Sequence, residues 1–297
     1  MKEYSYIEKH MGTTVSLAFV CDNEDYADNL AQTTFATIHE YELRFSRFLP
    51  DSELTLLNQT GSSVVSQEFR DLLKLSLKLA EQTKQAFNPL VQVATLGYQT
   101  SFSDLPTAVA VTKETYDTDF SKITIDDKSN QVTLASYQKL DFGGVLKGYL
   151  AAKLADSIME SANCQGCIIN IGGDLTTRGV DELHETFIFL LYNPITGEEI
   201  PVAIKDASLA TSGTYARRWQ TNQGQKHHIV DSTNQNNPAI DGMAVSVICT
   251  DGAMSEALTK LFLTKGETVA IATVSPTQYN YQYFFVTESG NIKSNIV

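Results

Sequence analysis

Two glycine-rich segments have the composition of turns that hold an anion. Residues 141–149 (DFGGVLKGY) join an expected strand to an expected helix, and residues 170–174 (NIGGD) follow a second expected strand. Paired glycines let the backbone turn with positive φ and approach a ligand, and the free N–H groups at a helix start bind anions, here beside Lys147. The alternative is an aspartate-capped turn that only reverses the chain.

A third segment, residues 210–218 (ATSGTYARR), combines short hydroxyl side chains with two guanidinium groups. Hydroxyls and the planar forks of arginine are suited to phosphate oxygens, so this segment is a candidate phosphate contact. Taken singly, Arg217 and Arg218 are more often surface charges.

Residues 227–231 (HHIVD) place a histidine three residues before an aspartate. Because the ordinary pKa of histidine lies near neutrality, such a side chain can accept a proton from an attacking hydroxyl. A neutral histidine with a structural role is the alternative for His228. Walker, Gly-x-Gly-x-x-Gly, His-Glu-x-x-His and Gly-x-Ser-x-Gly motifs are absent, so the common nucleotide and hydrolase templates fit poorly.

The charge of the chain limits its partners. Among 297 residues, 22 Lys and Arg stand against 35 Asp and Glu, which gives a net charge of −13. This charge repels phosphate backbones, so we expect no nucleic-acid partner. A site for an anionic nucleotide would need local compensation from backbone N–H groups, a cation or a few Lys and Arg side chains.

The N-terminus has no apolar core of signal-peptide length, and the sequence contains no apolar run of membrane-spanning length. We therefore expect a cytoplasmic protein without a transmembrane segment, and a membrane-anchored extracellular one only if a leader has been removed. Four cysteines are too few for a disulfide scaffold. Cys164 and Cys167 have redox or half-zinc spacing, but because no second pair or nearby histidine completes a metal site, a structural role is favoured.

The periodicity of apolar residues predicts both helices and strands. Steps of three and four predict helices at 27–45, 70–87, 147–163 and 253–263. Alternation predicts a hairpin at 123–134 and strands at 167–171, 187–192, 202–205, 245–249 and 281–286. Because these elements mix without βαβ alternation and no linker divides them, we expect one α+β domain over residues 1–297, with mixed or antiparallel sheets and packed helices.

Taken in order, these segments resemble the ApbE family of flavin transferases. The matching stretches are residues 11–14 (MGTT), 45–54 (FSRFLPDSEL), 87–91 (FNPLV), 140–149 (LDFGGVLKGY), 169–174 (INIGGD), 210–213 (ATSG) and 228–231 (HIVD). Any one of them is weak, but the ordered set is specific and extends over nearly the whole chain.

The resemblance implies two lobes around a flavin cleft and an FAD:protein FMN transferase. Such an enzyme moves FMN from FAD to a Ser or Thr of an acceptor flavoprotein that carries a flavinylation motif, and releases AMP. It implies His228 as the catalytic base for the acceptor hydroxyl. The residues implied around FAD are Met11, Phe87, Asn88, Asp141, Lys147, Gly172, Gly173, Asp174, Thr211, Ser212, Gly213 and Ile229.

A Mg²⁺ ion at the pyrophosphate is also implied by the resemblance. The family binds it through a backbone carbonyl of the first glycine turn, here Gly144, and through an Asp and a Thr one helical turn apart. Glu256 and Lys260 stand at those two positions. The Lys260 ammonium would repel Mg²⁺ or take its place as a point charge beside the pyrophosphate.

Two other interpretations of this helix stay open. A shift of one residue would offer Ser255 and Thr259 as ligands, and Glu256 and Lys260 could instead form a solvated i,i+4 pair. The chain also has Thr214 where Asp is usual and Ser232 where Pro is usual. An Mg²⁺-dependent transferase is therefore the main interpretation, and an FAD-binding relative without transferase activity is the alternative.

Overall fold

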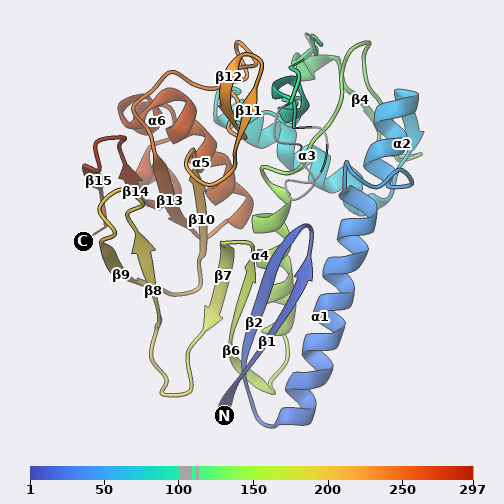
Figure 1. Cartoon of the computed structure of the whole chain (residues 1–297). Coiled ribbons are helices and arrows are strands. Elements are labelled where there is room, and N and C mark those ends of the chain that lie inside the picture. Colours follow the sequence, from blue (N-terminus) through green and yellow to red (C-terminus); the bar gives the residue numbers. More distant parts are fainter. Residues whose placement is uncertain (99, 101–108, 112–113, 297) are drawn as a thin grey trace.

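An eight-stranded sheet forms the centre of the protein (Figure 1). The computed structural model describes residues 1–98, 100, 109–111 and 114–296. The strand order is β1-β2-β6-β7-β10-β13-β14-β15, and each neighbouring pair runs antiparallel. The strands are β1 (Lys2–His10), β2 (Thr13–Cys21), β6 (Cys164–Ile171), β7 (Asp174–Gly179), β10 (Ser208–Gly213), β13 (Ala244–Cys249), β14 (Gln282–Val286) and β15 (Ile292–Ser294).

Helices cover one face of this sheet. Helix α1 (Glu24–Phe45) packs on β1 and β2, α4 (Leu146–Ile158) on β6 and β7, and α5 (Gly252–Lys265) on β10 and β13. The short helices α6 (Glu267–Thr273) and α7 (Pro276–Tyr279) follow α5. On the opposite face, the hairpin of β8 (Phe187–Tyr192) and β9 (Glu199–Ile204) packs on a smaller apolar cluster.

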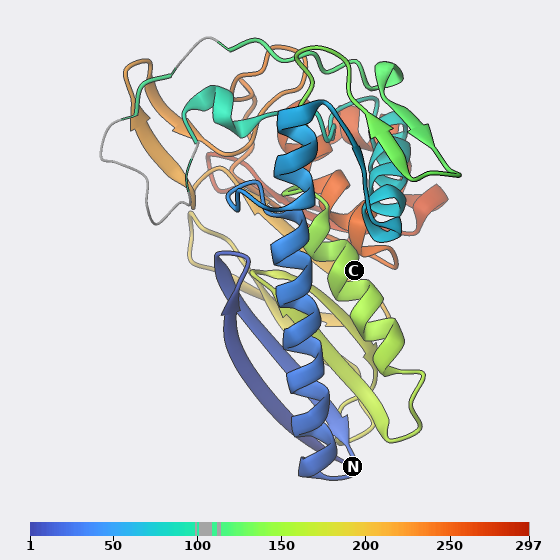
Figure 2. The same ribbon diagram turned by 90° about the vertical axis from the view of Figure 1, so that its right-hand side faces the viewer.

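A second lobe lies beyond the upper end of the sheet (Figures 1 and 2). Its elements are α2 (Glu53–Thr60), α3 (Gln67–Gln82), the 3-10 helices η1 (Val93–Leu96) and η3 (Phe120–Lys122), the small sheet of β3 (Ser62–Val64), β5 (Gln131–Thr133) and β4 (Thr124–Asp126), and the hairpin of β11 (Arg218–Thr221) and β12 (Gly224–His227). One cluster of buried apolar residues runs through both lobes, with members from β2, α3, α4 and α5.

Helix α1 links the sheet to the second lobe (Figure 2). It begins after Asn23, whose side-chain oxygen accepts a hydrogen bond from the Tyr26 N–H at 2.9 Å and so caps the first turn. At its other end, Phe45 stacks on Phe69 of α3 and meets Phe142 edge-on. These aromatic contacts fix where the chain leaves the helix, between the two lobes.

Helices α4 and α5 approach each other closely at two glycines. A Cβ on Gly148 would lie 2.3 Å from the Gly252 carbonyl oxygen, and a Cβ on Gly252 would lie 2.2 Å from that of Gly148. The close approach lets the buried Glu256 side chain of α5 accept a hydrogen bond from the Gly148 N–H at 2.5 Å. This bond satisfies a backbone donor in the first turn of α4, where no intrahelical partner exists.

Most of the predicted elements are confirmed, with different ends. The helix predicted at 70–87 is instead Gln67–Gln82, because Lys84 and Gln85 adopt left-handed backbone with φ of 50° and 67° and place residues 87–88 in a turn. Helix α4 ends at Ile158 and not at 163. The elements that were not predicted include helix α2 and the strands β1, β2, β3, β7, β10, β11, β12 and β15.

The cysteines pair differently from their spacing in the sequence. Cys21 of β2 and Cys164 of β6 form a disulfide, whereas Cys167 is buried and free. The cysteines therefore form one disulfide and no scaffold, and Cys164 is not paired with Cys167. Pairing of β2 with β6 brings Cys21 and Cys164 opposite each other, a contact that spacing along the chain could not indicate.

The observed architecture confirms the predicted α+β class with antiparallel sheets and packed helices. The treatment of residues 1–297 as one domain stays a prediction. Within the described residues, no helix combines the length and apolarity needed to cross a membrane.

The substitution Gly148→Ala tests the α4–α5 crossing. Alanine has the higher helix propensity and would stabilise a free helix, but its Cβ would force the two helices apart. We expect the free energy of unfolding to fall by about 1–3 kcal/mol in urea titrations. Ser157→Ala, on the exposed face of the same helix, is the control and should change it by less than about 0.5 kcal/mol. Equal or greater stability of Gly148→Ala would contradict the crossing.

Candidate functional site

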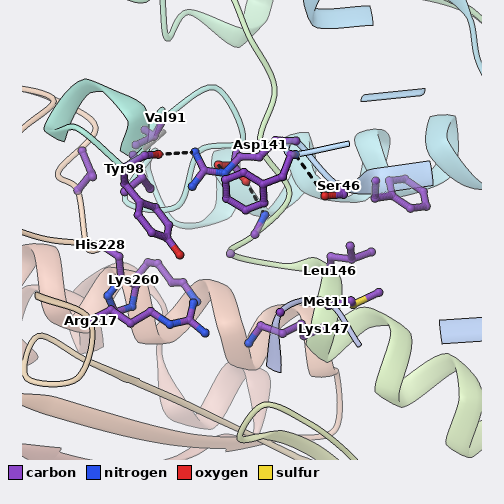
Figure 3. Close-up of a pocket in the computed structure, with 18 of the residues that line it drawn as sticks. Met11, Ser46, Val91, Tyr98, Asp141, Leu146, Lys147, Arg217, His228 and Lys260 are labelled. Atoms are coloured by element: carbon purple, nitrogen blue, oxygen red, sulfur yellow. Dashed lines mark hydrogen bonds and ion pairs between the residues drawn. The ribbon is translucent and has the colours of Figure 1, made fainter. Parts of the chain in front are cut away.

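A cavity of about 380 Å³ lies between the lobes (Figure 3). It is lined by the β1–β2 turn, the end of α1 and the residues after it, the segment 86–98, the first glycine turn with the start of α4, and residues 228–230. Of the residues predicted from the resemblance, the cavity wall contains Met11, Phe87, Asn88, Asp141, Gly144, Lys147, His228, Ile229 and Lys260.

Three cationic side chains gather on one wall of the cavity: Lys147, Arg217 and Lys260 (Figure 3). Lys147 contacts the carboxylate of Asp174, and Lys260 Nζ lies 3.4 Å from Glu256 Oε2. Within the described part of the chain, Arg217 has no carboxylate partner. Two carboxylates against three cations leave this wall positive, which suits an anion despite the net charge of −13.

Arg47 holds the opposite, aromatic wall together. Its guanidinium Nε lies 3.4 Å from Asp141 Oδ2, and its Nη1 donates to the Tyr98 carbonyl at 3.1 Å. The guanidinium carbon lies 4.5 Å from the ring centre of Phe48 and 4.8 Å from that of Tyr98. Arg47 lies within the 45–54 stretch of the resemblance, but no role was predicted for it. Asp141 positions Arg47 through their ion pair as well as lining the cavity.

His228 lies on the cavity wall beside the cations (Figure 3). Its Nδ1 is buried and has no hydrogen-bond partner among the described residues. Burial, together with the positive charges of Arg217 and Lys260, lowers the pKa of His228 to about 3. The imidazole is therefore neutral at neutral pH, but its pKa lies below the near-neutral value expected of a base. An anion bound beside Arg217 and Lys260 would raise the pKa of His228 and make it a stronger base, and the unpaired nitrogen is a group that a ligand can satisfy.

The second glycine turn lies behind the wall. Gly172 has φ of 67°, and a Cβ there would lie 2.6 Å from the Oγ1 of Thr13, which itself lines the cavity. Asp174 is buried and contacts Lys147. Gly172, Gly173 and Asp174 were predicted to line the FAD site, but they are absent from the described cavity lining. Gly172 instead packs on Thr13 and Asp174 contacts Lys147, and both of these partners line the cavity.

Strand β10 also differs from its prediction. Thr211 is exposed and its Oγ1 lies 2.9 Å from Ser246 Oγ of the neighbouring strand, whereas Ser212 is buried against α5. Successive side chains of a strand point to opposite faces, so the two cannot both face the cavity. Thr211, Ser212 and Gly213 are absent from the described lining, and Ser212 acts through Lys260, whose Nζ lies 3.4 Å from Ser212 Oγ.

Asn88 fixes its own loop as well as lining the cavity. Its Nδ2 donates to the Thr118 carbonyl at 2.9 Å, and its Oδ1 accepts from the Leu90 N–H at 2.9 Å. Binding of FAD by Asn88 and by the other predicted lining residues stays a prediction. Of the arginine pair, Arg217 lines the cavity, and Arg218 is exposed on β11.

The residues predicted to bind Mg²⁺ already engage one another. Glu256 Oε1 accepts from the Gly148 N–H, and Oε2 faces the Lys260 ammonium, which has no lone pair to offer a metal. The Thr259 hydroxyl donates to the Glu256 carbonyl at 2.7 Å and pairs with Ser212 Oγ at 2.7 Å. The Ser255 hydroxyl donates to the Asp251 carbonyl at 3.0 Å.

This donor set does not fit a resident magnesium ion. Mg²⁺ prefers an octahedral shell of oxygen ligands at about 2.0–2.1 Å. Of the predicted ligands, only Gly144 and Lys260 line the cavity. Glu256 also belongs to no cluster of three His, Cys, Asp or Glu side chains in the described residues, where the one such group with ligand atoms within 4.8 Å of one another is His10, His39 and Glu42.

Burial lowers the pKa of Lys260 from its ordinary value, although the Glu256 carboxylate acts in the opposite direction. The charge of Arg217 adds to the effect of burial. An anion bound at this wall would raise the pKa of Lys260 again, so anion binding and the charge on Lys260 favour each other.

A two-lobed α+β fold with an aromatic wall facing a cationic wall is the architecture of a protein suited to an aromatic, anionic ligand between its lobes. The chain belongs to the ApbE family, which it matches over residues 11–285. It is 24% identical over 301 residues to an FAD:protein FMN transferase of Klebsiella pneumoniae (strain 342), covering 97% of this chain and 90% of that protein.

The chain is also similar to a second relative in sequence and to a solved structure in fold. An FAD:protein FMN transferase of Treponema pallidum (strain Nichols) is 26% identical over 258 residues, covering 78% of this chain and 70% of that protein. The crystal structure of the ApbE protein from Thermotoga maritima superposes with a TM-score of 0.84 at 22% identity, covering 98% of this chain and 96% of that one. The predicted ApbE-like fold is confirmed.

The ionisation of His228 can be measured directly. With a pKa of about 3, its imidazole should remain neutral as the pH falls through 6.5, where an ordinary histidine takes up a proton. An NMR titration of the histidine ring resonances, with the His228→Asn variant used for assignment, should show a midpoint well below 6.5. A midpoint at or above 6.5 would contradict the buried, cation-flanked environment.

Proposed function

We propose that this chain is an FAD:protein FMN transferase, which moves FMN from FAD to a Ser or Thr hydroxyl of an acceptor protein and releases AMP. Membership of the ApbE family and the activity named for both curated relatives support this function. The observation that carries it in this chain is a neutral histidine beside a cluster of cations in one cavity.

The two walls of the cavity match the two halves of the substrate. Lys147, Arg217 and Lys260 suit the pyrophosphate, because charge-assisted hydrogen bonds to phosphate oxygens are the strongest that side chains make. Phe48, Phe87 and Tyr98 line the cavity and offer apolar contacts to an aromatic system, although Arg47 lies over the rings of Phe48 and Tyr98 and Tyr98 also stacks on Trp219. We therefore assign the pyrophosphate to the cationic wall and the isoalloxazine ring to the aromatic wall.

The reaction forms one P–O bond and breaks another. The acceptor oxygen bonds to the phosphorus on the FMN side, and the bond from that phosphorus to the bridging oxygen breaks, so AMP leaves with the bridging oxygen. The hydroxyl proton passes to neutral His228, which can return it to the leaving phosphate or to water. The cations stabilise the negative charge that spreads over the phosphoryl oxygens in the transition state.

Magnesium dependence was predicted from the resemblance, and the residues of this chain argue against a resident ion. The only carboxylate among the predicted ligands is Glu256, which is held by the Gly148 N–H and the Lys260 ammonium. We therefore assign no step of the reaction to a metal.

The acceptor is proposed to be a flavoprotein with an Asp-x-x-x-Gly-Ala-[Ser/Thr]-like motif.

The cytoplasm is the location proposed from the sequence. The Cys21–Cys164 disulfide weighs against a cytoplasmic location, because structural disulfides persist mainly in oxidising compartments.

A second candidate function is FAD binding without transfer. Lys260 at the position of a family metal ligand favours it, because loss of the metal can silence a site that still binds its ligand. The two functions differ in one product, since only the transferase releases AMP.

Release of AMP from FAD tests the proposed function. The purified protein, FAD and an acceptor carrying the motif should yield equal amounts of AMP and of acceptor with covalent flavin fluorescence on a denaturing gel. An acceptor with Ala in place of the Ser or Thr is the control and should give neither product. Bound FAD with no AMP under any metal condition would overturn the transferase and establish the binding protein.

The substitution His228→Asn tests the base. We expect FMN transfer to fall by about 100- to 10,000-fold, because proton removal by a positioned base contributes that much, while FAD binding is retained. The control is His184→Asn, since His184 is exposed and has φ of 63°, which asparagine tolerates. Equal loss of transfer in both variants, or none in His228→Asn, would exclude His228 as the base.

A further inference from the structure

Lys260 presents its ammonium to the cavity from a fixed position on α5. Its Nζ lies 3.4 Å from Glu256 Oε2 and 3.4 Å from Ser212 Oγ, and its Cε would lie 3.3 Å from a Cβ at Gly144. The ammonium therefore sits beside the glycine turn of the cavity wall, between the buried carboxylate and the cavity.

Lys260 and its neighbours form a cluster of positive side chains that attracts an anion and repels a metal cation. Lys147 and Arg217 line the same wall. The positive charge of Lys260 lowers the pKa of Lys147, and the positive charge of Arg217 lowers the pKa of Lys260. A divalent ion at Glu256 would add two charges to this wall and would have to displace the Lys260 ammonium or the Gly148 N–H. A pyrophosphate would instead relieve the repulsion among the three side chains.

We propose that the Lys260 ammonium stands in for the divalent cation, so that this chain binds the FAD pyrophosphate and transfers FMN without a metal. This inference rests on the proposed function for its catalytic half, whereas its binding half stands on the cavity alone. In the transfer step, Lys260 donates to phosphoryl oxygens as the P–O bond to the bridging oxygen breaks. No further reactant enters, because FAD and the acceptor hydroxyl supply all atoms of the products.

The binding half is tested by titrating the purified protein with FAD and following flavin fluorescence. We expect the Kd to change by less than about twofold between EDTA and millimolar Mg²⁺, and to rise by about tenfold or more in Lys260→Met, which keeps the length of the side chain without its charge. The matched control is Lys153→Met, which removes a lysine of α4 that does not line the cavity. FAD binding that is abolished by EDTA would overturn the proposal.

The catalytic half is tested by release of AMP under the same conditions. In the native protein, EDTA should change the rate of AMP release by less than about twofold. The substitution Lys260→Met should lower this rate by about 100-fold or more, the usual effect of removing a hydrogen-bond donor to the charge of the transition state. Lys260→Arg, which keeps the charge next to Glu256, should retain metal-independent transfer and guards against misfolding of the neutral variant. Transfer that requires Mg²⁺ in the native protein would overturn the inference and leave the proposed function intact.

Two further arms separate the remaining outcomes. If no AMP is released in any arm, the proposed function fails, and the FAD titration alone decides whether Lys260 replaces the metal in binding. Because His10, His39 and Glu42 offer another metal group, His39→Ala is assayed with and without EDTA. A change of more than about twofold with EDTA overturns the proposal whether or not it persists in His39→Ala, and that variant shows only whether this group holds the metal.

Discussion

The buried carboxylate of Glu256 is the group on which the rest of the site depends. One of its oxygens holds the Gly148 N–H in the first turn of α4, and the other faces the Lys260 ammonium on its own helix. A buried carboxylate is stable only when it is paired and hydrogen-bonded, so the close crossing of α4 and α5 is a condition for its presence. That crossing places Lys147 and Lys260 on the same wall.

The same interaction reconciles an acidic protein with an anionic ligand. Glu256 and Asp174 lie buried behind the wall, each beside one lysine, and the cations lie between these carboxylates and the cavity. This order allows three positive side chains to remain close together in the absence of a ligand, while the wall they form stays positive. Arg217 has no carboxylate partner in the described residues, so its positive charge is not offset by a buried carboxylate.

Sequence reasoning found those parts of the site that are local in the chain. The glycine turn at 141–149 and the place of His228 in the cavity could be predicted because turn chemistry and candidate bases are recognisable from a few neighbours. The lowered pKa of His228 could not, because it depends on burial and on Arg217 and Lys260. The role of Arg47 could not, because it depends on Asp141 and Tyr98, which lie far away in sequence. The placement of Thr211 and Ser212 on opposite faces could not be predicted either, because strand β10 was not predicted and its alternation decides which side chain faces α5.

The most direct measurement is a crystal structure of the FAD complex grown with Mn²⁺, with an anomalous difference map. The account predicts pyrophosphate oxygens within about 3 Å of the Lys147, Arg217 and Lys260 nitrogens, the distance of charge-assisted hydrogen bonds, and no manganese peak between Glu256 and the pyrophosphate. A manganese ion bound to Glu256 and the pyrophosphate, with the Lys260 ammonium turned away, would contradict it.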